Sequence, residues 1–244
     1  MTIDLNCDMG EGFDTDALIM PFISSANIAC GGHAGDENTM RETIQLALPH
    51  GVAIGAHPSY PDREHFGRKE MELPLEEISL SIQSQITTLK KITEYSGAKL
   101  NHVKPHGALY NTAAKNKELA MTIVKAIKSI DPLLKVFGLP FSALQVACTI
   151  EGLVFYSEGF ADRTYTSDGK LTPRSESNAL IDSTEHAIAQ AINMIEKQLV
   201  TSTEGITIKM PVQTICIHGD GSHAVSFATA IHNALKEKNI LIKH

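Results

Sequence analysis

Three consecutive segments decide the fold: VAIG (Val52 to Gly55), LEEISLSIQSQITTLKK (Leu75 to Lys91) and HVK (His102 to Lys104). The first and third are short β-prone runs. In the middle segment the apolar residues recur at three- or four-residue spacing, which is typical of an amphipathic helix. A strand, a helix and a strand in this order predict two parallel strands joined by a crossover helix.

The same alternation extends over the rest of the chain. It is compatible with a doubly wound sheet or a (β/α) barrel, and about seven strands in 244 residues favour the barrel. We therefore expect an α/β protein with one TIM-like, seven-stranded (β/α) barrel domain over residues 1–244. The other expected strands are Ile3 to Cys7, Ala26 to Ala29, Lys135 to Gly138, Leu153 to Ser157 and Thr214 to His218. The other apolar stripes fall at 40–48, 123–130, 188–199 and 227–235.

Composition and charge exclude several classes of protein. A chain with 43% hydrophobic and 20% charged residues can form a packed core, so general disorder is excluded. The net charge of −7 argues against a nucleic-acid binder, which needs a basic surface.

The most apolar stretch, Leu133 to Tyr156, is interrupted by charged residues and proline, so no membrane span is expected. The acidic N-terminus does not resemble a secretory signal, and we expect a cytoplasmic protein.

The four cysteines are widely spaced in the sequence. Cys7, Cys30, Cys148 and Cys216 form no C-x-x-C pair, so neither a disulfide framework nor a zinc ribbon is indicated. We expect them to be small buried side chains.

Histidine is the unusual part of the composition, with eleven His and no Trp. Four of them, His33, His57, His106 and His218, end or follow expected strands and lie beside Gly or Pro. The carboxyl ends of barrel strands converge on one rim, where active sites are built. The loops at this rim carry Asp8, Glu11, His33, Asp36, His57, Lys104, His106, Glu158, Asp162, Arg163, His218 and Asp220. The remaining histidines are expected to be structural or solvated: His50, His65, His102, His186, His223, His232 and His244.

Three cations in or near these loops could bind anions. Lys104 ends a strand between Val103 and Pro105, so we expect it to be half buried and paired with an acid or an anionic ligand. Arg163 and Arg174 could hold a carboxylate or phosphate through two hydrogen bonds.

Several signatures are absent from the sequence. There is no P-loop, no Rossmann glycine fingerprint, no H-E-x-x-H and no G-x-S-x-G. Of the kinds of chemistry considered, acid/base and metal-assisted chemistry are left.

Eight motifs follow one another in order from residue 4 to residue 220. They are DLNCDMGEGF (4–13), SANIACGGHAGDE (25–37), GAHPSYPD (55–62), FGR (66–68), HVKPHGALYN (102–111), FADRTY (160–165), GKLTPR (169–174) and CIHGD (216–220). Together they resemble the LamB/YcsF family, the A subunits of bacterial 5-oxoprolinase, also called lactam utilisation proteins. The sequence departs from the usual family pattern at Gly32, Glu37, His65 and Lys69, which affects loop shape near the rim.

The resemblance implies a seven-stranded barrel of the glycoside hydrolase/deacetylase type. It also implies opening of the 5-oxoproline lactam to L-glutamate with ATP, together with Mg²⁺, as cosubstrate, carried out with partner subunits B and C. The catalytic residues that we expect are Asp8, His33, His57, Lys104, His106, His218 and Asp220. The substrate-binding residues that we expect are Glu11, Asn27, Asp36, Asp162, Arg163 and Arg174.

Our hypothesis assigns stabilisation of anionic oxygen to Lys104 with Arg163 or Arg174. Asp8, His57, His106 and His218 would share the proton transfers. Two alternatives stay open. The first is a metal-dependent amide or N-acetyl hydrolase acting without ATP, in which Asp8, His57 and His106 hold Zn²⁺ or Mn²⁺ and the metal acidifies water. The second is a noncatalytic subunit that presents 5-oxoproline to its partners.

Overall fold

The computed structural model describes residues 1–217, 219 and 224–244. Within these ranges seven parallel strands form a closed barrel, because the first strand pairs with both the second and the last. The seven-stranded TIM-like α/β barrel expected from the sequence is thereby confirmed. Its strands are β1 (Thr2–Met9), β2 (Ser25–Ala29), β3 (Ala53–His57), β4 (Leu100–Val103), β5 (Lys135–Gly138), β6 (Phe155–Phe160) and β9 (Thr214–Ile217).

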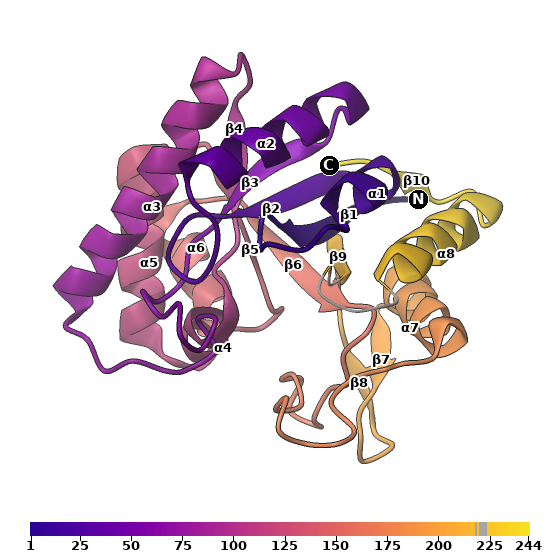
Figure 1. The fold of residues 1–244 in the computed structure, drawn as a ribbon. Helices are drawn as coiled ribbons and strands as arrows, with labels where there is room; N and C mark the ends of the chain where they lie inside the picture. Colours follow the sequence, from indigo (N-terminus) through magenta and orange to yellow (C-terminus); the bar gives the residue numbers. More distant parts are fainter. Residues whose placement is uncertain (218, 220–223) are drawn as a thin grey trace.

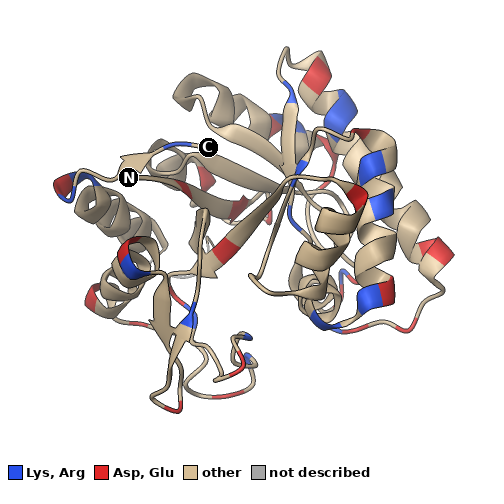
Figure 2. Cartoon of the chain, turned by 180° about the vertical axis from the view of Figure 1, so that it is seen from behind, with Lys and Arg blue, Asp and Glu red and all other residues tan. Residues whose placement is uncertain are grey.

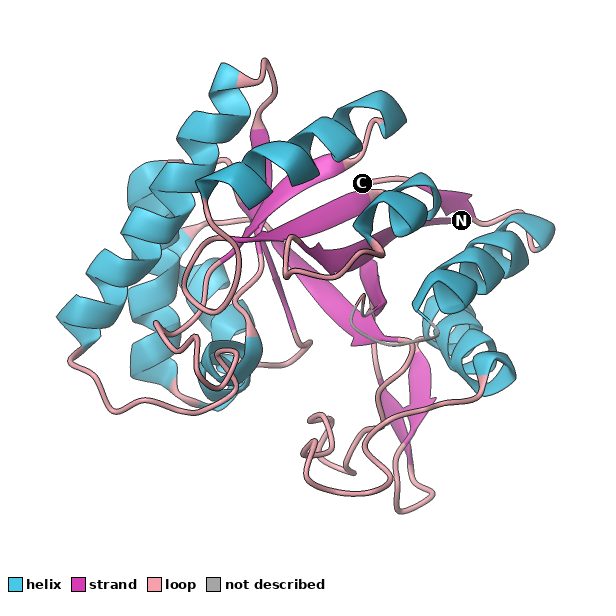
Figure 3. Cartoon of the chain, viewed as in Figure 1, coloured by secondary structure: helices cyan, strands magenta, loops and turns pink. Residues whose placement is uncertain are grey.

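Helices surround the strands (Figures 1 and 3), with α3, α5 and α6 on one side and α7 and α8 on the other. In α3 the residues Ile78, Ile82, Ile86 and Leu89 are buried, as their spacing predicts. Each such side chain stabilises the fold by roughly 1.5–3 kcal/mol. The helices are α1 (Asp16–Ile19), η1 (Met20–Phe22), α2 (Glu37–Ala47), η2 (Leu48–His50), α3 (Leu75–Tyr95), α4 (Gly107–Lys115), α5 (Lys117–Ile130), α6 (Ala143–Glu151), α7 (Thr184–Lys197) and α8 (Ala224–Glu237).

Three short strands lie outside the closed barrel. β10 (Leu241–Ile242) pairs in parallel with the start of β1, which brings the two ends of the chain together. β7 (Leu199–Thr201) and β8 (Thr207–Lys209) form an antiparallel hairpin. The segment 161–183 joins β6 to α7 and extends beside this hairpin in Figure 1. Isolated bridges between Arg163 and Leu180 and between Tyr165 and Leu171 hold this segment against itself.

A strand boundary differs from the sequence prediction in a way that matters for the site. The sequence ends the sixth strand at Ser157, but β6 continues to Phe160, with Glu158 beside Thr214 of β9. A carboxylate is tolerated inside a strand here because Lys104 faces it within the barrel.

Close packing inside the barrel requires glycine at position 55. A Cβ atom at Gly55 would lie 2.0 Å from Nε2 of His102 on the neighbouring strand β4. His102 is fully buried, and its Nε2 donates a hydrogen bond to Oδ1 of Asn27 at 2.8 Å.

Lys or Arg and Asp or Glu are interspersed over the outer helices in the view of Figure 2. None of the helices in the described ranges is long and apolar enough to cross a membrane. All four cysteines are buried and free, as expected.

Candidate functional site

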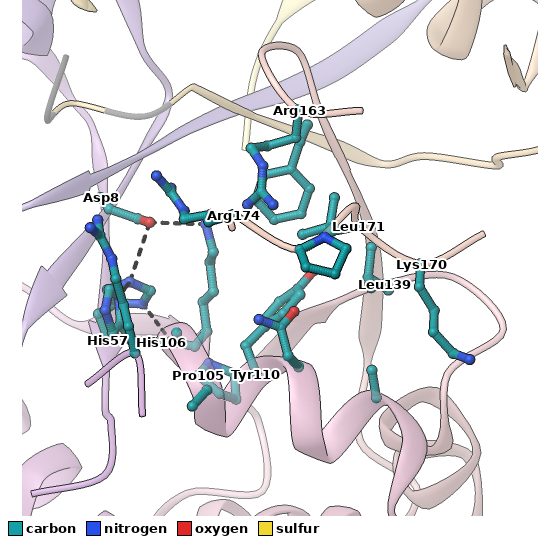
Figure 4. A pocket seen from close by; sticks show the side chains of 18 of the residues that line it. Asp8, His57, Pro105, His106, Tyr110, Leu139, Arg163, Lys170, Leu171 and Arg174 are labelled. Carbon is teal, nitrogen blue, oxygen red and sulfur yellow. Dashed lines mark hydrogen bonds and ion pairs between the residues drawn. The ribbon is translucent and has the colours of Figure 1, made fainter. Parts of the chain in front are cut away.

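A cavity of about 450 Å³ lies at the carboxyl ends of the barrel strands (Figure 4). Its size is typical of small-molecule sites. Residues that follow β1, β3, β4 and β6 line it, as the strand-end pattern predicts. The lining residues with charged or titratable side chains are Asp8, Glu11, His57, Arg68, Lys104, His106, Tyr110, Lys115, Arg163, Lys170 and Arg174.

Asp8, near the end of β1, is fixed by two donors. Its Oδ1 accepts hydrogen bonds from Nδ2 of Asn27 at 2.8 Å and from Nζ of Lys104 at 2.9 Å. Its Oδ2 lies 3.3 Å from Nε2 of His57. Asn27 is itself oriented by His102, so a buried chain of hydrogen bonds sets the direction of the Asp8 carboxylate.

Lys104 lies between two carboxylates inside the barrel. Its Nζ is 2.9 Å from Oδ1 of Asp8 and 2.9 Å from Oε1 of Glu158, and the side chain is only 3% exposed. Burial alone would lower the pKa of Lys104, but the charges of Asp8 and Glu158 raise it well above its ordinary value. Lys104 is therefore a permanent cation at neutral pH and cannot serve as a base.

His57 and His106 face each other across the inner edge of the cavity. Nε2 of His57 is 2.9 Å from Nδ1 of His106. The outer nitrogen of each ring points at a backbone carbonyl oxygen: His57 Nδ1 at Lys104 (2.7 Å) and His106 Nε2 at Phe66 (2.9 Å). A carbonyl oxygen can only accept, so each outer nitrogen carries a proton.

His33 and Glu11 complete this group of side chains. The His33 ring stacks on the His106 ring at a centroid distance of 3.7 Å, and its Nε2 is 2.9 Å from Oε1 of Glu11. Burial, with a smaller contribution from His57, lowers the pKa of His33 to about 3. The same two causes hold the pKa of His106 well below its ordinary value. Both rings are neutral at pH 7.

Two local features hold the histidine-bearing loops in place. Gln85 of α3 accepts a hydrogen bond from the backbone N–H of Ser59 at 3.0 Å and donates to its carbonyl at 2.9 Å, which fixes the loop after β3. Gly67 has a φ of +63°, and a Cβ atom there would lie 2.9 Å from Cβ of His33 and 3.0 Å from Cδ2 of His106. Glycine is therefore required at this position for the rings to stack.

The segment 161–183 supplies the cations on another side of the cavity. Arg163 is buried, and its guanidinium donates to the carbonyls of Thr172 at 2.6 Å and Ala179 at 3.2 Å. Burial lowers the pKa of Arg163 to about 10, so it remains charged at pH 7. Arg174 is exposed and lines the same cavity (Figure 4).

Not every expected site residue reaches the cavity. Asp36 is exposed, and its carboxylate caps α2 by accepting from the N–H groups of Asn38 and Thr39. Asp162 is half buried and is not among the lining residues. Asn27 and His33 do not line the cavity but contact residues that do. Asn27 bonds to Asp8, and His33 bonds to Glu11. His218 and Asp220 lie outside the described residues.

Several side chains that shape the site were given no role by the sequence prediction. Glu158 and Asn6 are fully buried in the barrel, where Nδ2 of Asn6 donates to Oε1 of Glu158 at 3.0 Å. The sequence signal that could have identified Glu158 and Asn6 is a polar residue inside or directly after a β-prone run. Arg68 and Tyr110 also line the cavity, and both lie in quoted motifs.

The cavity combines a fixed carboxylate, a buried lysine cation and an imidazole pair, so it can polarise an oxygen and transfer protons. Cys216 contacts Lys104, but burial raises the pKa of its thiol well above the ordinary value, which disfavours it as a nucleophile. Fold and site together define a (β/α)-barrel protein with an acid/base pocket at the carboxyl rim. The chain belongs to the LamB/YcsF family, whose profile it matches over residues 3–244.

Individual relatives agree with this assignment. The chain is 48% identical over 246 residues to a Tolumonas auensis protein that is named as the A subunit of 5-oxoprolinase, covering 99% of this chain and 98% of the relative. The crystal structure of the lactam utilization protein from Thermus thermophilus matches with a TM-score of 0.94 and 37% identity, over 100% of this chain and 99% of that one. The peptidoglycan deacetylase PdaC of Bacillus subtilis shares the fold alone, with a TM-score of 0.53 and 14% identity over 99% and 86% of the chains.

Proposed function

We propose that this chain is one component of an ATP-dependent 5-oxoprolinase, which hydrolyses 5-oxoproline to L-glutamate while ATP is hydrolysed to ADP and phosphate. Family membership and the 48% identical relative named for 5-oxoprolinase support the proposal. The observation that carries it is the Lys104–Asp8 pair beside the His57–His106 pair, in a cavity rich in cations.

The chemistry of the substrate explains why these groups are needed. A five-membered lactam is a resonance-stabilised amide, so water attacks its carbonyl carbon slowly. Transfer of the γ-phosphoryl group of ATP to the lactam oxygen would activate that carbon. Water then forms a bond to the carbon and gives up a proton, and the carbon–nitrogen bond breaks with a proton going to nitrogen, which leaves the new carboxyl group as an acyl phosphate. A second water molecule displaces phosphate from this acyl phosphate, and L-glutamate is released.

Lys104 is assigned to electrostatic stabilisation in this scheme. It stays protonated between Asp8 and Glu158, so it can stabilise negative charge on the lactam oxygen or its phosphoryl group. Because the cation is held by the barrel strands, it need not reorganise during the reaction.

Asp8 and the histidines are assigned to proton transfer. Oδ2 of Asp8 faces Nε2 of His57, so a proton taken from water by the carboxylate can pass to the imidazole pair. We assign the protonation of the departing nitrogen to His57, His106 or His218. Each such transfer typically contributes ~10²–10⁴-fold to the rate.

The charge of the cavity favours an anionic substrate. Six Lys or Arg side chains and two carboxylates line it, whereas the whole chain carries a net charge of −7. The substrate carries a carboxylate and its activated form also a phosphoryl group. We assign these anions to Arg163 and Arg174, which can hold planar oxyanions through paired hydrogen bonds.

The proposal includes partner subunits B and C, consistent with the name of the relative, which describes one subunit of a larger enzyme. It leaves open which of the three binds ATP with Mg²⁺. A reaction that consumes ATP fits a cytoplasmic protein.

A coupled assay tests the proposal by measuring ADP and glutamate formed from 5-oxoproline, with this chain alone and with the two partner subunits. We expect turnover only in the complete mixture. The Asp8→Asn variant should lose at least ~10²-fold of the rate. The matched control Asp182→Asn, at an exposed position before α7, should retain it. No turnover in any combination would overturn the proposal.

A second candidate function is hydrolysis of an amide or N-acetyl group without ATP, with Asp8, His57 and His106 holding Zn²⁺ or Mn²⁺. One observation favours it: ligand atoms of Glu11, His33, His57 and His106 all lie within 4.8 Å of one another. A divalent ion would supply Lewis-acid activation of water. Metal-dependent hydrolysis that proceeds at full rate without ATP would select this candidate.

A further inference from the structure

Hydrogen bonds place a proton on the outer nitrogen of His57 and on that of His106. Each outer nitrogen donates to a backbone carbonyl, so in the neutral ring the inner nitrogen carries a lone pair and no proton. The two inner nitrogens, His57 Nε2 and His106 Nδ1, are 2.9 Å apart. Two lone pairs at this distance repel each other unless a cation lies close to both.

The surroundings of this pair contain more ligand atoms than a shared proton needs. Oε1 of Glu11 lies 3.5 Å from Nδ1 of His106 and 3.9 Å from Nε2 of His57. Nε2 of His33 lies 2.9 Å from the same carboxylate oxygen, but its ring is parallel to that of His106, so it holds Glu11 in place and does not point at the pair. A proton bridges two atoms, whereas two imidazole nitrogens and one carboxylate oxygen converge here from several loops.

The distances suit a divalent transition metal. Two ligands at ~2.1 Å from one ion lie ~3 Å apart when adjacent and ~4.2 Å apart when opposite in octahedral geometry. The observed separations of 2.9, 3.5 and 3.9 Å fall close to this range. Imidazole with carboxylate suits zinc, manganese and related ions.

The outer contacts also match those of metal-binding histidines. Such residues donate their other ring N–H to a carbonyl or carboxylate, which sets the ring orientation. The carbonyls of Lys104 and Phe66 fill this role for His57 and His106. Both rings are buried, with His57 1% and His106 6% exposed.

We infer that Glu11, His57 and His106 form a binding site for one divalent transition-metal ion at the inner edge of the cavity. A bound ion would occupy the inner nitrogens of His57 and His106, so in the metal-loaded chain the proton transfers of the lactam reaction fall to Asp8 and His218. The site has Glu11 in place of Asp8 in the ligand set expected from the sequence. Asp8 is already held by Lys104 and Asn27.

Calorimetric titration of the untagged, chelator-treated chain with Zn²⁺ tests the inference directly. We expect one ion per chain. His106→Ala and Glu11→Gln should each weaken binding by at least ~10-fold. The matched control His186→Ala, exposed on α7, should bind as the parent does. No saturable binding by the parent chain, or equal binding by His106→Ala, would overturn the site.

A measurement on the unmodified chain covers the case in which the variants fail to fold. Zn²⁺ should shift the imidazole ¹⁵N resonances of His57 and His106 together, while those of His186 stay unchanged. The metal site would be refuted if the chain took up no Zn²⁺ and showed a proton resonance shared by His57 and His106. The cation between the two rings would then be a proton. Neither readout depends on enzymatic activity, so the outcome is separate from that of the coupled assay.

Discussion

The barrel interior and the segment 161–183 hold their cations in opposite ways. Lys104 in the interior is ion-paired with two carboxylates on other strands of the barrel, and its position is set by barrel closure. Arg163 in the segment is held by two backbone carbonyls of that same segment and keeps its positive charge for a ligand. The interior thus fixes charge by ion pairing, whereas the segment presents charge to the cavity.

Lys104→Met gives the largest expected effect, because it leaves Asp8 and Glu158 buried without their cation. Breaking a buried ion pair in this way costs ~3–5 kcal/mol of unfolding free energy. Chemical denaturation measures the loss. The control Lys170→Met alters an exposed lysine and should change stability by less than ~0.5 kcal/mol. Equal unfolding free energies for the two variants would show that the ion pairing in the interior does not stabilise the fold.

Gly67→Ala should reduce activity more than stability. The added Cβ atom would press on His33 and His106, and a displacement of ~1 Å at a reacting group can cost ~10²-fold in rate. The coupled assay and denaturation, run side by side, measure the two effects. Gly205→Ala, which also has a positive φ but open space around it, controls for backbone strain. Equal activity of the two variants would contradict the steric account.

Arg163→Lys retains the charge but loses the forked geometry that bonds to Thr172 and Ala179. We expect a loss of ~1–3 kcal/mol in stability because buried carbonyls lose donors. KM for 5-oxoproline should rise because the segment loosens. Faster proteolysis within residues 164–178 would report the loosening, and an unchanged proteolytic rate would show that the guanidinium does not hold the segment.

Arg174→Ala should have the smallest effect on the fold. The residue is exposed, so unfolding free energy should change by less than ~0.5 kcal/mol. Loss of a cation in the cavity should raise KM several-fold while kcat changes little. Arg41→Ala, on the outer face of α2, provides the control. An unchanged KM would remove Arg174 from the proposed anion site.

The sequence predicted the barrel well because each repeating unit is encoded locally. The apolar stripe of α3 and the β-prone runs around it depend on residues close in the chain. Short elements such as α4, α6 and the β7–β8 hairpin escaped prediction, since their few residues carry too little periodicity. The end of β6 was placed too early because Glu158 is charged.

The candidate site was predicted in part. The strand-end rule correctly brought Asp8, His57, Lys104 and His106 to one cavity. It could not separate Asp36, which caps a helix, from Glu11, which faces the histidines, because both are acids in glycine-containing loops. Only the path of each loop distinguishes them.

The order of the barrel strands and longer helices, the rim position of most of the polar residues and the family were determined by the sequence alone, because they follow from local periodicity and ordered motifs. The tertiary structure decided that Glu158 forms an ion pair with Lys104 and that His57 and His106 meet at 2.9 Å. Those contacts join residues 54 and 49 positions apart in the chain, and they depend on strand register and barrel closure, which local sequence does not encode.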